Sequence, residues 1–391
     1  MTIGQPATTL GFSASELVQR VERHSLRVQQ PASTGTLVSL AMGEPDFATP
    51  ERITRAAAKA LEDGFTHYSP MRGEPVLREA IARSLSETAG GDLSADDVLV
   101  TQGGTAGLAA AMLAVVNPGD RVVIPDPSYS LYADLVNMAG GTVVPVPLAE
   151  DLHWDLAALS DALVGARLFV FCNPSNPTGI VHSRAELDAL AAAVAGTDTL
   201  VLADEAYSEL VYTPEPSTSA LQLPGLRDRT VYCQTFSKSY AMTGWRVGYL
   251  WGPPEVIDAA ARVHGTFNGS LNSAVQHAAV VALQQCQDDI AAMRASYEAR
   301  CELMYSALSR IAGLEVRQPE GAFYLFPKYH LDIPSSRLTA ELRGFGVAVR
   351  PGGEFGASGE HHLRLSYAAS AEHITAGVER LAVGLSELAR R

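Results

Sequence analysis

The sequence predicts an α/β protein built on a mainly parallel sheet that helices cover on both faces. Between Val98 and Ala203, short apolar segments alternate with helical segments of about ten residues. Polar and turn-forming residues follow the ends of several apolar segments. The chain has 391 residues, more than one hydrophobic core usually serves, so we expect a second, smaller domain beside the sheet.

The alternating region gives the order of the elements. We expect strands at 98–101, 121–124, 142–146, 168–172 and 200–203, and helices at 106–115, 131–139 and 184–194. Continuous apolar strands indicate a sheet buried on both faces, which is typical of parallel strands. Ligands of such sheets bind beyond the carboxyl ends of the strands, so site residues are expected directly after each strand.

The two ends of the chain predict the smaller domain. Helical spacing covers 14–30, a break follows at 31–35, an apolar strand covers 37–41, and a helix covers 50–63. From about residue 285 we expect a long helix to 310, strands at 314–317, 322–326, 347–350 and 362–366, and a closing helix. The expected division is 1–50 as an arm and part of the small domain, 51–285 as the large domain, and 286–391 as the rest of the small domain.

Composition and charge exclude several classes of function. Hydrophobic residues make up 47% and charged residues 18%, which is ordinary for a folded protein. The net charge of -14 argues against nucleic acid or an anionic membrane as the main partner. The four cysteines form no CxxC pair and are expected to be free thiols, with no metal site. No basic leader and no long apolar run is present, so a cytoplasmic enzyme is expected.

A lysine follows one apolar strand in an unusual setting. Lys238 lies in the segment TFSKSYAMTGWRVGY, directly after the expected strand at 230–234. Burial there should lower its pKa from about 10.4 and leave an amine that can react with a carbonyl group. Thr235 and Ser237 offer hydroxyls, and Arg246 stands among glycines that let a phosphate approach the backbone. A surface lysine beside a structural arginine is the alternative, which so dense a pattern disfavours.

A carboxylate follows the strand at 200–203. Asp204 stands at the mouth of the expected sheet, with Tyr207 three residues later. An aspartate that keeps a pyridine nitrogen protonated is the group that pyridoxal phosphate needs to act as an electron sink. Tyr207 can donate to the phenolate oxygen of that ring. Taken alone, an aspartate that follows a strand is more commonly a helix N-cap, which is the alternative for Asp204.

Two further loops complete the pattern. The turn NPSNPTG after the strand at 168–172 can present the Asn176 amide toward the same phenolate oxygen. The loop QGGT at 102–105 stands between a strand and a helix start, where backbone N–H groups favour a phosphate. Each loop alone is weak evidence.

Together, in this order, the four elements resemble the class I and II aminotransferases among the fold-type I pyridoxal phosphate enzymes. The resemblance extends from GEPDF at Gly43, through Tyr68, to RLSY at Arg364. It implies a large domain with a mainly parallel seven-stranded sheet flanked by helices, a smaller α+β domain, pyridoxal 5'-phosphate as cofactor, and a homodimer. Thr235 stands where the family more often has Ser, and the 103–107 loop lacks the family's commoner acidic or amide side chain.

The resemblance also implies a role for each site residue. Lys238 would form the Schiff base, Asp204 would bind the pyridine nitrogen, and Tyr207 and Asn176 would bind the phenolate oxygen. Tyr129 would stack on the ring, and Arg364 would hold the substrate α-carboxylate near Gly43 and Asn176. The phosphate would be held by Gly104, Thr105, Thr235, Ser237 and Arg246, with Tyr68 from the second subunit.

These features predict a ping-pong transamination between an amino acid and a 2-oxo acid, with Lys238 moving the proton. Aspartate or an aromatic amino acid is the favoured substrate, although no second arginine or lysine for a distal carboxylate is identified from the sequence. A β-lyase for cysteine conjugates and an amino-acid oxidase or hydroxylase stay open as alternatives on the same fold. A transcription regulator would need a basic DNA-binding module before Gly43, for which the arm leaves no room.

Overall fold

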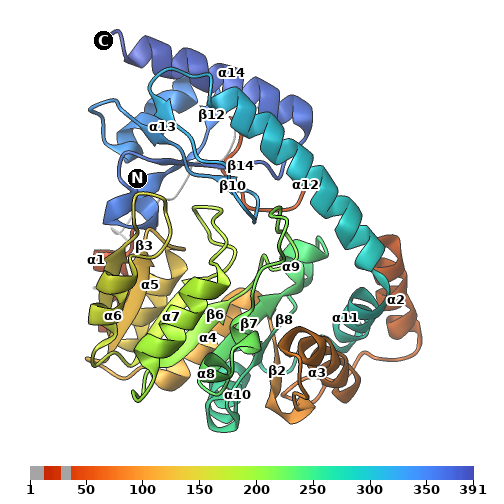
Figure 1. Ribbon diagram of the computed structural model, residues 1–391. Helices are drawn as coiled ribbons and strands as arrows, with labels where there is room; N and C mark the ends of the chain where they lie inside the picture. Colours follow the sequence, from red (N-terminus) through yellow and green to blue (C-terminus); the bar gives the residue numbers. More distant parts are fainter. Residues whose placement is uncertain (1–12, 28–36) are drawn as a thin grey trace, which may run out of the picture.

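A seven-stranded sheet forms the centre of the computed structural model, which describes residues 13–27 and 37–391 (Figure 1). The strand order is β2-β8-β7-β6-β5-β3-β4. The pairs among β3 to β7 are parallel, whereas β8 runs antiparallel to both of its neighbours. The predicted mainly parallel sheet is therefore confirmed. The strands are β2 (Val98–Thr101), β3 (Arg121–Asp126), β4 (Thr142–Pro147), β5 (Leu168–Cys172), β6 (Leu200–Asp204), β7 (Thr230–Thr235) and β8 (Gly248–Trp251).

The central strands are apolar on both faces because helices cover both faces. In β5, Leu168, Val170 and Cys172 join the core on one side, whereas Phe169 and Phe171 join the core on the other. The first side is covered by α4 (Gly103–Val115), α5 (Leu131–Ala139) and α10 (Pro254–Asn268). The second is covered by α6 (Leu156–Leu163), α7 (Arg184–Val194) and α8 (Pro224–Arg227).

Strand register places the ends of three parallel strands together. Cys172 of β5 pairs with Asp204 of β6, and Asp204 pairs with Cys233 of β7. The segments that leave β5, β6 and β7 therefore emerge side by side at one edge of the sheet. The residues after these strands can share a site although they are far apart in the sequence.

A third helical group packs beside the antiparallel end of the sheet. The buried faces of α3 (Pro75–Ala89) and α11 (Ser273–Gln285), with Ile53 of α2 (Glu51–Glu62), contact Val98, Val100 and Tyr249. From this group the long helix α12 (Gln287–Leu308) leads to the smaller C-terminal part, as Figure 1 shows in teal.

The smaller part combines both ends of the chain. The strand β1 (Val38–Ser39) pairs in parallel with β12 (Val347–Ala348). Beside them lie the sheet β10-β14-β13 and the pair β11-β9. In the view of Figure 1, β10 and β14 lie below α13 and α14. The domain boundaries stay a prediction. The elements are β9 (Leu314–Glu315), β10 (Tyr324–Leu325), β11 (Lys328–Tyr329), β13 (Arg350–Pro351), β14 (Leu363–Ser366), α13 (Ser335–Gly344) and α14 (Ala371–Leu388).

Several expected elements differ in extent. The first helix, α1 (Glu16–His24), is shorter than the predicted 14–30, because Ser25 is extended and ends it. The predicted break at 31–35 and the last residues of that expected helix lie outside the described residues. Most strands of the smaller part have two residues. Among the described residues, none of the helices combines the length and the hydropathy needed to cross a membrane.

Candidate active site

A cavity of about 420 Å³ lies at the carboxyl edge of β5, β6 and β7, where the smaller part covers the sheet. Arg364 of β14 and the segment after β1 form the side that faces the sheet. All the predicted site residues except Tyr68 line this cavity. They are Gly43, Gly104, Thr105, Tyr129, Asn176, Asp204, Tyr207, Thr235, Ser237, Lys238, Arg246 and Arg364.

Lys238 lies in the short helix α9 (Phe236–Ser239), which starts where β7 ends. Its Nζ donates a hydrogen bond of 2.6 Å to the carbonyl oxygen of Gly43, and it lies 5.6 Å from the centre of the Phe323 ring. Burial, followed by the nearby charge of Arg364, lowers the pKa of Lys238 to about 8. The neutral fraction of this amine near physiological pH is therefore a minority, but far larger than that of an ordinary lysine, and the neutral form can act as a nucleophile or a base.

Asp204 is the last residue of β6 and is buried. Its Oδ2 accepts a hydrogen bond of 2.7 Å from the hydroxyl of Tyr132, and its Oδ1 accepts one of 3.2 Å from the backbone N–H of Ala206. Burial raises the pKa of Asp204, while the hydrogen bond from Tyr132 opposes that rise. The residues after Asp204 form turns, so its alternative explanation as a helix N-cap does not hold.

The loop before α4 and the segment around Arg246 form a second end of the cavity. Arg246 has the left-handed φ of 56° and donates from Nη1 to the carbonyl oxygen of Thr243 at 2.8 Å. A Cβ on Gly103, whose φ is +78°, would lie 2.5 Å from Nη2 of Arg246. Glycine at 103 is thus what lets the guanidinium approach the start of α4. There the backbone N–H groups of the first turn and the helix dipole favour an anion.

Two hydroxyls stand beside that helix start. Thr235 Oγ1 donates to Ser237 Oγ at 2.9 Å and accepts from the backbone N–H of Ser237 at 3.2 Å. A Cβ on Gly104 would lie 3.4 Å from the Thr235 side chain, so the two segments are in close contact. Backbone donors, hydroxyls and one guanidinium therefore converge here, which is the donor set that a phosphate requires.

Arg364 is buried, and two of its three guanidinium nitrogens donate hydrogen bonds. Nη1 donates to Asn176 Oδ1 at 3.0 Å, and Nη2 donates to the Ala41 carbonyl oxygen at 2.8 Å. The guanidinium lies 4.4 Å from the centre of the Tyr324 ring. Its Nε is buried and has no hydrogen-bond partner among the described residues. An unpartnered buried N–H is costly, and a carboxylate from a ligand in the cavity would satisfy it.

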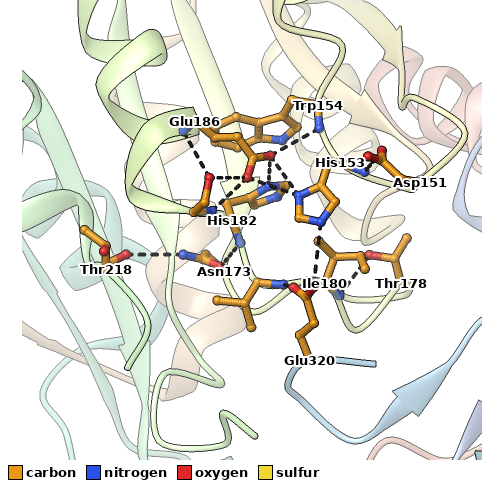
Figure 2. A network of polar contacts seen from close by, with 12 residues as sticks. Asp151, His153, Trp154, Asn173, Thr178, Ile180, His182, Glu186, Thr218 and Glu320 are labelled. Atoms are coloured by element: carbon orange, nitrogen blue, oxygen red, sulfur yellow. Dashed lines mark hydrogen bonds and ion pairs between the residues drawn. The ribbon is translucent and has the colours of Figure 1, made fainter. Parts of the chain in front are cut away.

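A hydrogen-bond network behind the cavity fixes the loop that carries Asn176 (Figure 2). Asn173 accepts from the backbone N–H of His182 at 2.9 Å. His182 and His153 each place Nδ1 3.1 Å from Glu186, which also accepts from the backbone N–H of Ser183 in the capping box of α7. The contact with Glu186 raises the pKa of His153 to about 10.

The same three side chains could offer ligand atoms to a metal ion, since those atoms lie within 4.8 Å of one another. The sequence did not predict that His153, His182 and Glu186 lie together. However, both carboxylate oxygens of Glu186 accept hydrogen bonds from backbone N–H groups or a hydroxyl in addition to the histidines. We therefore interpret His153, His182 and Glu186 as a hydrogen-bonded support for the loop.

The structure brings four further side chains to the site. Tyr132 reaches Asp204, and Tyr324 places its hydroxyl 3.0 Å from that of Tyr207. Arg27 and Arg350 also line the cavity, and the sequence did not identify either of them as a cavity residue. Arg350 forms an ion pair with Glu354. These contacts join segments that are distant in the sequence, and no local motif marks them.

Tyr68 lies apart from the cavity of its own chain. It stands between α2 and α3 and is 97% exposed. Phe65, Met71 and Phe267 are exposed apolar residues as well. The expectation that Tyr68 reaches the site of a second subunit stays a prediction.

Known proteins are similar to this chain over nearly its whole length. Residues 35–381 match the family model "Aminotransferase class I and II". The bifunctional aspartate aminotransferase and glutamate/aspartate-prephenate aminotransferase of Petunia hybrida is 37% identical over 369 residues, 88% of this chain and 76% of that protein. The crystal structure of an aromatic aminotransferase from Pyrococcus horikoshii OT3 matches with a TM-score of 0.88 and 32% identity over 95% of this chain and 99% of that one. Aspartate aminotransferase from Thermus thermophilus with maleate matches with a TM-score of 0.85 and 34% identity over 89% and 92%.

Proposed function

This chain belongs to the class I and II aminotransferase family, and from that premise we propose that it transfers the amino group of aspartate or of an aromatic amino acid to a 2-oxo acid. It is a pyridoxal phosphate-dependent transaminase of fold type I. The proposed substrates follow from the names of its relatives, which include aspartate and aromatic aminotransferases. The observation that carries the proposal is the convergence of Lys238, Asp204 and Arg364 on one cavity.

The residues of the cavity fit pyridoxal 5'-phosphate. The glycine at 103 opens room for Arg246 beside a helix start, and Lys238 offers a buried amine with a lowered pKa. We propose that the phosphate is held by Gly104, Thr105, Thr235, Ser237 and Arg246, and that Lys238 binds the cofactor covalently through Nζ. Asp204 would bind the pyridine nitrogen, Tyr207 and Asn176 the phenolate oxygen, and Tyr129 the face of the ring. When bound, the cofactor supplies an electron sink for the carbanion formed at the substrate α carbon.

The chain's own residues orient the substrate and move its proton. Arg364 would hold the α-carboxylate through its guanidinium, with Asn176 and the backbone of Gly43 beside it. The neutral Nζ of Lys238 would be the base that takes the proton from the α carbon. Asp204 lines the same cavity, with Tyr132 donating to it.

A homodimer is part of this proposal. Tyr68 is almost fully exposed. Phe65 and Met71, which are close to Tyr68 in the sequence, and Phe267 of α10 are exposed apolar residues as well. Burial of such residues against a second copy would remove apolar area from water and would bring Tyr68 toward the partner's phosphate site. A cytoplasmic location stays a prediction from the sequence.

The test is a transamination assay of the purified protein with pyridoxal phosphate. Each of a panel of L-amino acids is paired with 2-oxoglutarate or oxaloacetate, and the new amino acid is measured, with Lys238→Ala as the control. We expect transfer from aspartate or an aromatic donor and none by the variant. Pyruvate and ammonia from a cysteine conjugate, or oxygen uptake with an amino acid, in place of transfer would favour the lyase or the oxidase alternative.

A further inference from the structure

We propose that Glu320 is a positioning residue that ties the smaller part of the protein to the loop after β5, residues 173–182, and so keeps Asn176 in place against Arg364. This inference rests on the proposed function, because it concerns how the residues that would bind the substrate α-carboxylate are held. Glu320 lies between β9 and β10, outside the lining of the active-site cavity. It would therefore act on the substrate only through the loop that carries Asn176.

The segment that carries Glu320 is inserted between two stretches of chain that leave the large sheet. The backbone N–H groups of Glu320 and Gly321 both donate to the carbonyl oxygen of Gly179, each at 2.9 Å. On the other side, the backbone N–H of Tyr212 donates to the carbonyl oxygen of Glu320 at 2.8 Å. The first contact is with the loop after β5, and the second is with the chain that follows β6. The main chain of the smaller part is thus attached to both.

The carboxylate of Glu320 adds a contact to the same loop and one to its support. Oε2 accepts a hydrogen bond of 2.9 Å from the backbone N–H of Val181, and Oε1 lies 3.9 Å from Nε2 of His153 (Figure 2). Contacts with Glu186, and then with Glu320, raise the pKa of His153 to about 10, so this ring is positively charged at neutral pH. Burial would raise the pKa of Glu320, but the hydrogen bonds from His153 and Val181 lower it overall. A carboxylate of the smaller part therefore faces an imidazolium of the large part.

Asn176 belongs to the same loop and meets the smaller part inside the cavity. The backbone N–H of Ser175 donates to the carbonyl oxygen of Ile180 at 2.9 Å, which closes the turn that contains Asn176. Asn176 Oδ1 accepts from Nη1 of Arg364 at 3.0 Å. The smaller part thus holds this loop twice, through a guanidinium inside the cavity and a carboxylate behind it. Without the contact behind the cavity, Asn176 should shift, and the guanidinium that it orients would be less well placed for a substrate carboxylate.

The experiment compares Glu320→Ala and Glu320→Gln with a control, Glu302→Gln. Glu302 is an exposed residue of α12 that accepts a hydrogen bond from Gln318, so the control removes a carboxylate near the same segment but away from the loop. The first readout is hydrogen–deuterium exchange of the full chain, followed in peptides that contain Val181. Exchange at the Val181 amide should become roughly tenfold faster in Glu320→Ala, a change equivalent to about 1.4 kcal/mol. Glu320→Gln should show a smaller change, because glutamine keeps an acceptor for this N–H and loses only the charge that faces His153.

The second readout is the steady-state kinetics of the loaded enzyme with the amino-acid donors that the wild type accepts. Every donor carries an α-carboxylate, so Glu320→Ala should raise KM for all of them by a similar factor, about tenfold, while kcat changes less than about threefold. Glu320→Gln should recover most of the lost affinity, and Glu302→Gln should behave like the wild type in both readouts.

Two results would overturn the inference. One is an unchanged exchange rate at Val181 in Glu320→Ala. The other is a loss of stability or of kcat with no rise in KM, because Glu320 would then support only the fold. A wild-type protein that transfers an amino group from no donor at all would instead remove the proposed function, and the exchange measurement would still test the contact between Glu320 and the loop.

Discussion

The hydroxyl of Tyr132 donates a hydrogen bond of 2.7 Å to Oδ2 of Asp204, so a tyrosine on α5 fixes the carboxylate at the end of β6. Both side chains are buried, and the backbone N–H of Ala206 is a second donor to Asp204. The bond from Tyr132 fixes the position of the group that we propose binds the pyridine nitrogen, and it opposes the rise in the pKa of Asp204 that burial causes.

Replacement of Tyr132 by Phe should therefore weaken cofactor binding without removing it. Loss of a hydrogen bond to a buried charged group costs about 1.5–3 kcal/mol, so the affinity for pyridoxal phosphate and kcat should each fall about tenfold or more. Cofactor affinity is measured by fluorescence titration of the apoenzyme. Tyr329→Phe is the control, because its hydroxyl donates to the carbonyl oxygen of Ile333 in the smaller part. Equal losses in both variants would contradict a role for Tyr132 at the site.

The lowered pKa of Lys238 predicts the pH dependence of cofactor capture. Only the neutral amine reacts with the aldehyde, and the pKa is about 8, not the ordinary 10.5. The rate at which the apoenzyme takes up pyridoxal phosphate should rise with pH and level off above about 8. Stopped-flow absorbance from pH 6 to 10 measures this rate. A midpoint near 10.5 would mean that the amine is solvated like a surface lysine.

Gly103→Ala should damage the proposed phosphate site. The new Cβ would meet the Arg246 guanidinium at 2.5 Å, and the backbone there is left-handed. Backbone strain alone costs about 1–2 kcal/mol, and displacement of Arg246 should lower cofactor affinity further. Gly119→Ala is a matched control, since Gly119 also has a positive φ but no atom within 4 Å of its Cβ position. We expect both variants to lose stability and only Gly103→Ala to lose cofactor affinity.

The pair of His153 and Glu186 predicts a pH-dependent contribution to stability. The folded-state pKa of His153 is raised to about 10, so its stabilisation is complete below the ordinary value of 6.5 and is lost as pH rises toward 10. The difference in unfolding free energy between wild type and His153→Gln, from urea denaturation, should reach about 2 kcal/mol near pH 6 and shrink above pH 8. His330→Gln removes a more exposed pair with Glu315 and should change stability little. A difference that grows with pH would contradict this pairing.

Sequence reasoning located the site because the residues follow buried apolar strands. Lys238, Asp204 and Asn176 each come within a few residues of the end of β7, β6 or β5, and such strands are recognisable from composition alone. The pairing of Cys172 with Asp204, and of Asp204 with Cys233, then brings the ends of these three strands together. The predicted boundaries of β2, β5, α5 and α7 agree with the structure for the same reason.

What the sequence did not predict depends on packing between distant segments. Tyr132 is the second residue of the apolar helix α5 and is 72 residues from Asp204. Arg27 reaches the cavity only because α1 docks on α5. Between β7 and β8 the chain forms only the four-residue helix α9 and a short 3-10 turn. The alternation of strands with helices of about ten residues, which marked the parallel strands, is therefore absent there.

The pairing of β1 with β12 also determines when the site can form during synthesis. The carbonyl groups of Ala41 and Gly43, which receive Arg364 and Lys238, are carried by a segment that leaves the ribosome early. Its strand partner, Val347–Ala348, is made near the end of translation. The large sheet can fold while the chain is still being made. The segment that carries Ala41 and Gly43, however, can take its place in the cavity wall only after β12 has been made. Cofactor retention is therefore a late event, and a ribosome that stops before β12 releases a chain that has its lysine but cannot complete the site around it.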